Sequence, residues 1–161
     1  MAATAKLRDI VDSLQMASDE RVSYLDRTTG EVVEVSGNEM SMAEEGEPPD
    51  GLPDWRREDV ELARRISEDS SGNFVSLPTP WDVNEHAIME EFCDSLPAGQ
   101  SRDTVCISIK GRGAFRRFKD SLHVLGLAER WYRYRDEKFK EIAIEWCREN
   151  NIPYVDDVPA R

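Results

Sequence analysis

The sequence predicts a small α+β protein, mostly helical, that folds as a single domain over residues 1–161. Three observations carry this prediction. Several stretches repeat apolar residues at helical spacing, two strand-like runs flank a glycine turn, and 39% of the 161 residues are hydrophobic with 8% aromatic. A chain of this length can bury one core.

The N-terminal part predicts a helix followed by a β-hairpin. Residues 4–16 form the helix, whose apolar side chains recur every three or four positions. Residues 22–25 and 31–35 are rich in β-branched side chains, and Gly30 stands where a type I turn with a bulge needs a left-handed residue. This hairpin is the strongest β-strand signal in the chain.

Residues 37–53 differ in composition from their neighbours. They contain acidic side chains and no Lys or Arg, with three prolines and three glycines. Such a segment buries too little apolar surface to offset the entropy of ordering it. We therefore expect a mobile acidic loop, which could also attract a basic partner.

Two helices and a third short strand are expected in the middle of the chain. The first helix runs over residues 54–67, and residues 73–77 then form a strand that ends before two prolines. Asp82, with Glu85 three residues later, resembles a capping box that begins a helix ending near Leu96.

Residues 111–150 contain two further helices, which form a C-terminal helical pair. In the first, over residues 113–125, the apolar positions fall within one arc, and Gly126 follows as a left-handed C-cap. That arc consists of Phe115, Phe118, Leu122 and Leu125 and is expected to be core. The second helix, over residues 127–150, places Arg135 in the middle of its apolar and aromatic face. A charge there must be paired or must reach solvent.

Positive charge is concentrated in the same region. Residues 106–141 carry 10 Lys and Arg against 5 Asp and Glu, although the whole chain has a net charge of −12. The structural interpretation is that acidic segments neutralise these cations within the fold. The functional interpretation is an anionic partner, either nucleic acid or an acidic protein surface. The candidate contact residues are Arg112, Arg116, Lys119, His123, Trp131, Tyr132 and Arg135.

Arg135 has the same two interpretations. As a structural residue, its stem packs on aromatic rings and its guanidinium binds a carboxylate. As a site residue, it joins Trp131 and Tyr132 in an anion-binding or base-stacking site, since guanidinium groups and aromatic rings serve such sites together.

The sequence also resembles a known bacterial family. The runs GRGAFRRFKD at 111–120 and ERWYRYRDE at 129–137, followed by residues 142–150, are similar to the hallmark segment of uncharacterised protein family number 0158. The residues YLD at 24–26 and TGEV at 29–32 resemble its N-terminal part. The resemblance implies a small cytosolic α+β protein with a helix before the Gly-Arg-Gly run. Residues 101–110 alternate as a strand would but begin like a helix, and the resemblance favours the helix.

The family brings no established activity, so function is inferred from residue chemistry. We expect a cytoplasmic, non-enzymatic binding or regulatory module, without a cofactor or a membrane span. One alternative is an acidic mimic that occupies a nucleic-acid-binding protein, and another is a small enzyme. No phosphate loop, metal-binding helix or nucleophile motif supports an enzyme. Three cysteines, Cys93, Cys106 and Cys147, are too widely spaced for a metal signature and fit buried thiols.

Overall fold

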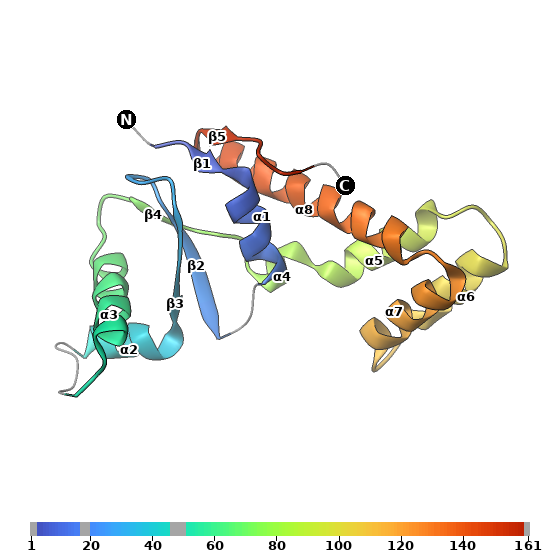
Figure 1. Cartoon of the computed structure of the whole chain (residues 1–161), viewed down its shortest axis with the longest axis horizontal. Coiled ribbons are helices and arrows are strands. Elements are labelled where there is room, and N and C mark those ends of the chain that lie inside the picture. The colour runs from blue at the N-terminus through green and yellow to red at the C-terminus, as the bar shows by residue number, and fades with distance from the viewer. Residues whose placement is uncertain (1–2, 17–19, 46–50, 160–161) are drawn as a thin grey trace.

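The computed structural model describes residues 3–16, 20–45 and 51–159 and confirms a mixed α+β architecture that is mostly helical. Figure 1 shows an elongated arrangement. A three-stranded sheet with helices α2 (Gly37–Glu44) and α3 (Asp54–Ser67) lies at one end. Helices α6 (Gln100–Ser108) and α7 (Ala114–Leu125) lie at the other end, and α1 (Leu7–Gln15), α5 (Glu85–Ser95) and α8 (Ala128–Glu149) lie between them. No helix within the described ranges is long and apolar enough to cross a membrane.

The predicted hairpin and third strand form one antiparallel sheet. Strand β2 (Arg21–Asp26) lies between β3 (Val32–Ser36) and β4 (Phe74–Ser76). The hairpin turn contains Gly30 in the left-handed region, with a φ of 76°. A side chain at Gly30 would also collide with the backbone of the N-terminal segment. The turn therefore requires glycine both for its backbone conformation and for space.

A second, two-stranded sheet joins the two ends of the chain. Strand β1 (Ala5–Lys6) pairs in parallel with β5 (Tyr154–Val155), and the Ala5 N–H donates to the Pro153 carbonyl oxygen at 2.8 Å. Helix α1 (Leu7–Gln15) consequently begins after this strand, later than the predicted start at residue 4. Strands of two residues have no periodicity, so the sequence pattern does not reveal them.

The prediction of a loop over residues 37–53 is wrong for its first half. Helix α2 (Gly37–Glu44) begins there with a capping box. The Ser36 N–H donates to Glu39 Oε2 at 2.8 Å, and the Glu39 N–H donates to Ser36 Oγ at 3.1 Å. This box gives two backbone N–H groups hydrogen-bond partners and so stabilises the start of a helix in a segment whose composition predicts a loop. Residues 46–50 lie outside the described part of the chain.

Helix α2 packs against α3 (Asp54–Ser67), whose bounds agree with the prediction. The two helices and strand β3 share a small hydrophobic cluster. Its buried members are Val35, Ala43, Val60, Ala63 and Ile66. This cluster is separate from the larger core that supports the C-terminal helices.

The next segment contains three helices: α4 (Pro80–Val83), α5 (Glu85–Ser95) and α6 (Gln100–Ser108). The predicted capping role of Asp82 is wrong, because Thr79 is the N-cap of α4 and Asp82 is its N3 partner. Asn84, in the left-handed region, caps α5 instead. Helix α6 settles the ambiguity of residues 101–110 in favour of a helix.

The C-terminal helical pair consists of α7 (Ala114–Leu125) and α8 (Ala128–Glu149), joined through the left-handed Gly126 as predicted. Three aromatic rings form the centre of the larger core. Trp131 packs edge-on against Phe92, with ring centroids 5.3 Å apart, and against Phe118 at 4.8 Å. Edge-to-face pairs of this kind stabilise a core beyond the area that they bury. This core connects α5, α7 and α8.

Candidate functional site

Three cations in the middle of α8 are paired with carboxylates of other segments. Arg135 Nε donates to Glu85 Oε1 at 2.8 Å. Lys138 Nζ lies 3.3 Å from a Glu91 oxygen of α5, and Lys140 Nζ lies 2.6 Å from an oxygen of Asp156 near β5. For these residues the structural interpretation of the positive charge is confirmed, because the acidic segments neutralise them within the fold.

Arg135 has the surroundings of a structural residue and also faces a pocket. Its guanidinium carbon lies 4.7 Å from the Phe139 ring centroid, and its side chain is 21% exposed. Together with Tyr132 of α8 and residues of α1, it lines a cavity of about 440 Å³. The Arg135 guanidinium, on an apolar helix face, requires an anionic partner, and that partner is the Glu85 carboxylate at the start of α5.

Replacement of Glu85 by Gln should destabilise the fold by about 1–3 kcal/mol, between the usual values for exposed and buried ion pairs. Glu85 is 34% exposed, and the change leaves the Arg135 charge without its carboxylate. Urea unfolding gives the free energy directly. The control is Glu90→Gln on the same helix, whose pair with His86 is more than half exposed. Equal midpoints for the two variants would show that the Arg135 pair contributes no stability.

The predicted contact residues do not form one surface. Trp131 is only 1% exposed and belongs to the core, so the prediction that it contacts a partner is wrong. Tyr132 and Arg135 lie at the pocket between α1 and α8. The remaining four, Arg112, Arg116, Lys119 and His123, lie on α7 or in the turn before it.

Arg116, Lys119 and His123 recur at helical spacing along α7, whereas Arg112 lies in the turn before the helix, between two left-handed glycines. Arg112, Arg116 and His123 are exposed, and Lys119 is half-buried. Among the described residues, none of the four forms an ion pair with a carboxylate. In this they differ from the paired cations of α8, and the positive charge remains available to an external anion.

An aromatic ring belongs to the same surface. Phe115, which the sequence pattern places in the core, is 44% exposed. Lys119 Nζ lies 4.4 Å from its ring centroid. On a helical wheel Phe115 is about 60° from the buried Phe118, at the edge next to the cations. That edge position was the signal that could have identified it. We call Arg112, Phe115, Arg116, Lys119 and His123 the α7 cationic face.

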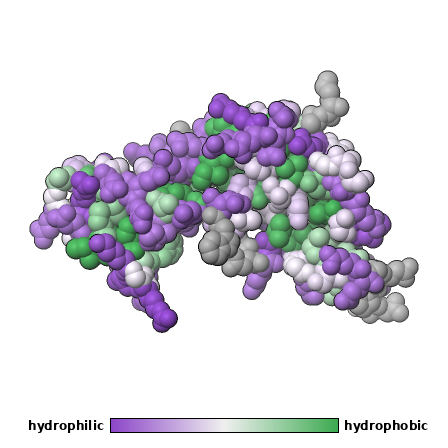
Figure 2. Space-filling view, turned by 180° about the vertical axis from the view of Figure 1, so that it is seen from behind, coloured by the Kyte–Doolittle hydropathy of each residue, from purple (hydrophilic) through white to green (hydrophobic). Residues whose placement is uncertain are grey.

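Other exposed apolar side chains occur at this end of the molecule. Ile107 of α6 is 66% exposed, and Val124 of α7 is 85% exposed. The view from behind shows hydrophobic and hydrophilic patches side by side at the end that holds these two helices (Figure 2). The α7 cationic face is therefore part of a mixed surface and not a purely charged one.

The turn before α7 is held by Arg117, which the sequence did not single out. Its guanidinium donates to the carbonyl oxygens of Lys110 and Arg112. Gly111 and Gly113 both have left-handed backbones, with φ angles of 80° and 71°. A Cβ at Gly113 would lie 3.2 Å from Arg117 Nη1, which is a close approach. The two glycines thus let the turn close on Arg117, and the closed turn fixes the backbone that carries Arg112.

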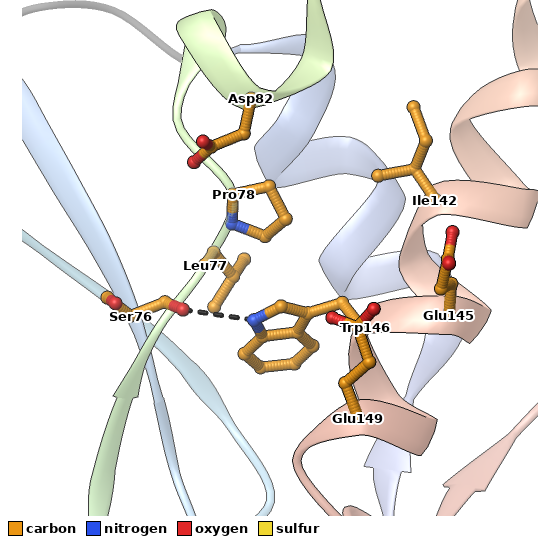
Figure 3. Close-up of a pocket in the computed structure, with 8 residues that line it drawn as sticks. All are labelled: Ser76, Leu77, Pro78, Asp82, Ile142, Glu145, Trp146 and Glu149. Atoms are coloured by element: carbon orange, nitrogen blue, oxygen red, sulfur yellow. Dashed lines mark hydrogen bonds between the residues drawn. The ribbon is translucent and has the colours of Figure 1, made fainter.

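A different cavity lies between the end of β4 and α8, and its charge is negative. It has a volume of about 370 Å³, and Trp146 forms part of its wall, with the indole Nε1–H donating to the Ser76 carbonyl oxygen at 3.0 Å (Figure 3). Asp82, Glu145 and Glu149 line it. The Thr79 backbone N–H and hydroxyl donate to the Asp82 carboxylate and lower its pKa, so this group is ionised at neutral pH. Three carboxylates make this cavity unsuitable for an anion.

Comparison with known proteins gives a family but no activity. A family model described as "Uncharacterised protein family (UPF0158)" matches residues 53–158. A Pseudomonas aeruginosa protein named "UPF0158 protein PA5073" is 30% identical over 66 residues. That alignment covers 40% of this chain and 43% of the relative, so the chain spans less than half of the relative's length. No solved structure matches the chain.

Proposed function

Because this chain belongs to the uncharacterised protein family UPF0158, whose description assigns no activity, we propose from geometry that it is a non-enzymatic module that binds single-stranded nucleic acid. The binding surface is the α7 cationic face. The observation that carries the proposal is the combination of Arg112, Arg116 and Lys119, which have no carboxylate partner within the described residues, with the exposed Phe115 ring.

The acidic net charge does not prevent this contact. The field of exposed charges is screened over about 8–10 Å at physiological salt, so a partner on α7 responds mainly to nearby groups. Residues 110–133 carry seven Lys and Arg against two Asp and Glu. Helix α2, which carries two Glu and no Lys or Arg, lies at the opposite end of the molecule beside α3 (Figure 1). Three of the four acidic residues of the adjacent α5 are paired with cations, since Glu85 and Glu91 pair with α8 and Asp94 pairs with Arg102. The fourth, Glu90, contacts His86 of the same helix.

The aromatic ring favours nucleic acid over an acidic protein. Guanidinium and ammonium groups bind phosphates and carboxylates alike, so the cations alone do not distinguish the two partners. A base can stack on an exposed aromatic ring, a contact that a chain of carboxylates cannot make, and such stacking is worth about 1–3 kcal/mol per base. Phe115 is therefore the residue that discriminates between the two partner classes.

The test compares Phe115→Ala with wild type on two polymers, a mixed-sequence single-stranded oligonucleotide and polyglutamate. Loss of one stacking contact should weaken oligonucleotide binding by about 5- to 150-fold and leave polyglutamate binding unchanged. Fluorescence anisotropy at about 50 mM salt measures both, because electrostatic binding is strongest at low salt. Val124→Ala is the matched control, since Val124 is an exposed apolar residue of the same helix.

Two results would contradict the proposal. If Phe115→Ala binds the oligonucleotide as tightly as wild type, the ring makes no contact with bases. If wild type binds polyglutamate as tightly as the oligonucleotide, the cations recognise negative charge in general, and an acidic protein becomes the better partner class.

A further inference from the structure

Two cysteines that are far apart in the sequence meet between helices α5 and α6. Cys93 belongs to α5 and is 1% exposed, whereas Cys106 belongs to α6 and is partly exposed. Helix α5 packs against α6, and both cysteines line one pocket between the two helices. The sequence predicted only buried thiols. A spacing of 13 positions does not show that two successive helices place both side chains in one pocket.

A pocket gives access to this pair. It has a volume of about 450 Å³, and both cysteines line it. His86 forms another part of its lining, fixed by a 3.0 Å contact from Nε2 to the Ile109 carbonyl oxygen and a 3.2 Å contact from Nδ1 to Glu90. Lys110 and Gly111, at the start of the turn before α7, also line it. A small organic disulfide can therefore enter the pocket and approach Cys106, the more exposed of the two cysteines.

The two thiols are not equivalent. Burial and the neighbouring Cys106 sulfur raise the pKa of Cys93 to about 12, so Cys93 is protonated at neutral pH. The thiolate is the nucleophile in thiol–disulfide exchange, and the attacking sulfur must be accessible. Cys106 therefore reacts first with an external reagent. Cys93 lies in the right place to react second, with the sulfur of Cys106.

We infer that Cys93 and Cys106 form a thiol–disulfide exchange site that a low-molecular-weight disulfide converts into an intramolecular disulfide. The Cys106 thiol loses its proton, and its sulfur attacks one sulfur of the reagent. The reagent's S–S bond breaks, and one half leaves as a thiolate that takes up a proton. Cys93 then loses its proton and attacks the Cys106 sulfur, which expels the second half as a thiol. Two protein thiols are oxidised, and one reagent disulfide is reduced to two thiols.

The new bond would join α5 to α6. Helix α6 leads directly into the turn that Arg117 closes and into α7, so the bond would fasten this end of the molecule to the larger core. Cys147 provides an internal comparison, because it is fully buried on α8 and burial raises its pKa to about 11. The inference concerns the two sulfurs only and does not depend on nucleic-acid binding.

The test incubates the full chain at neutral pH without oxygen with hydroxyethyl disulfide, which is small and uncharged. Remaining thiols are then alkylated, and the peptides are mapped by mass spectrometry. Before alkylation we expect a total mass lower by two hydrogen atoms. After alkylation we expect a peptide cross-linked between Cys93 and Cys106 and an alkylated Cys147. The variant Cys93→Ser should stop at the mixed disulfide on Cys106, and Cys147→Ala should cross-link as wild type does.

The wild-type map can refute the inference without any variant. A stable mixed disulfide on Cys106 with no cross-link would show that Cys93 cannot reach it. A cross-link that includes Cys147, or three alkylated thiols after long exposure, would also overturn the assignment. In the variants, a first adduct on Cys93 in Cys106→Ser at the wild-type rate would reverse the proposed order of attack.

Discussion

Replacing Trp131 by Ala is expected to lower the free energy of unfolding by about 3–5 kcal/mol, the usual cost of removing a large aromatic side chain from a core. The indole is 1% exposed and contacts both Phe92 and Phe118 edge-on. Its removal leaves a cavity where α5, α7 and α8 meet. Because small proteins are stable by only about 5–15 kcal/mol, a large fraction of the total stability would be lost. Urea unfolding followed by circular dichroism measures the change.

The matched control is Phe115→Ala, an aromatic truncation on the neighbouring helix. Phe115 is 44% exposed, so its loss should cost less than about 1 kcal/mol. The two substitutions therefore separate the core ring from the surface ring. A loss in Trp131→Ala no larger than that in Phe115→Ala would mean that the indole does not hold the three helices together.

The second large effect concerns binding. The double variant Arg112→Glu/Arg116→Glu is expected to bind a single-stranded oligonucleotide about 10- to 100-fold more weakly than wild type. Two contacts of about 1 kcal/mol each are replaced by repulsion between carboxylates and phosphates. Both arginines are exposed, and no carboxylate of the described residues pairs with either, so the fold should keep its stability. Anisotropy measures binding, and urea unfolding checks stability.

A control with the same change in net charge is available elsewhere on the surface. Arg57→Glu/Arg148→Glu also replaces two exposed arginines, one near the start of α3 and one in the last turn of α8. If the whole-molecule charge governed binding, both double variants would lose the same affinity. If the α7 cationic face is the contact surface, the control should retain wild-type affinity.

The sequence predicts the elements that have long, regular patterns. The helices α3, α7 and α8 and the β2–β3 hairpin agree closely with expectation, because apolar periodicity and a glycine turn specify them locally. The two-residue strands β1 and β5 are too short to have a period. Helix α2 depends on the Ser36–Glu39 capping box, a signal that the acidic, proline-rich composition concealed.

The site was predicted only in part, for a different reason. A helical wheel gives the direction of a side chain but not the neighbour that covers it. Phe115 and Trp131 both lie beside core positions, yet only Trp131 is enclosed by Phe92 and Phe118. Similarly, the need of Arg135 for a partner follows from its place on an apolar face. The identity of that partner, Glu85, depends on how α5 packs against α8.

The central claim is that the α7 cationic face binds nucleic acid through its phosphates, and the salt dependence of oligonucleotide affinity tests it most directly. With three phosphate contacts, from Arg112, Arg116 and Lys119, the plot of log K against log salt should have a slope of about −2. Loss of two contacts in Arg112→Glu/Arg116→Glu should reduce that slope to about −0.7 or less. A flat response in wild type, or the same slope in both proteins, would contradict the claim.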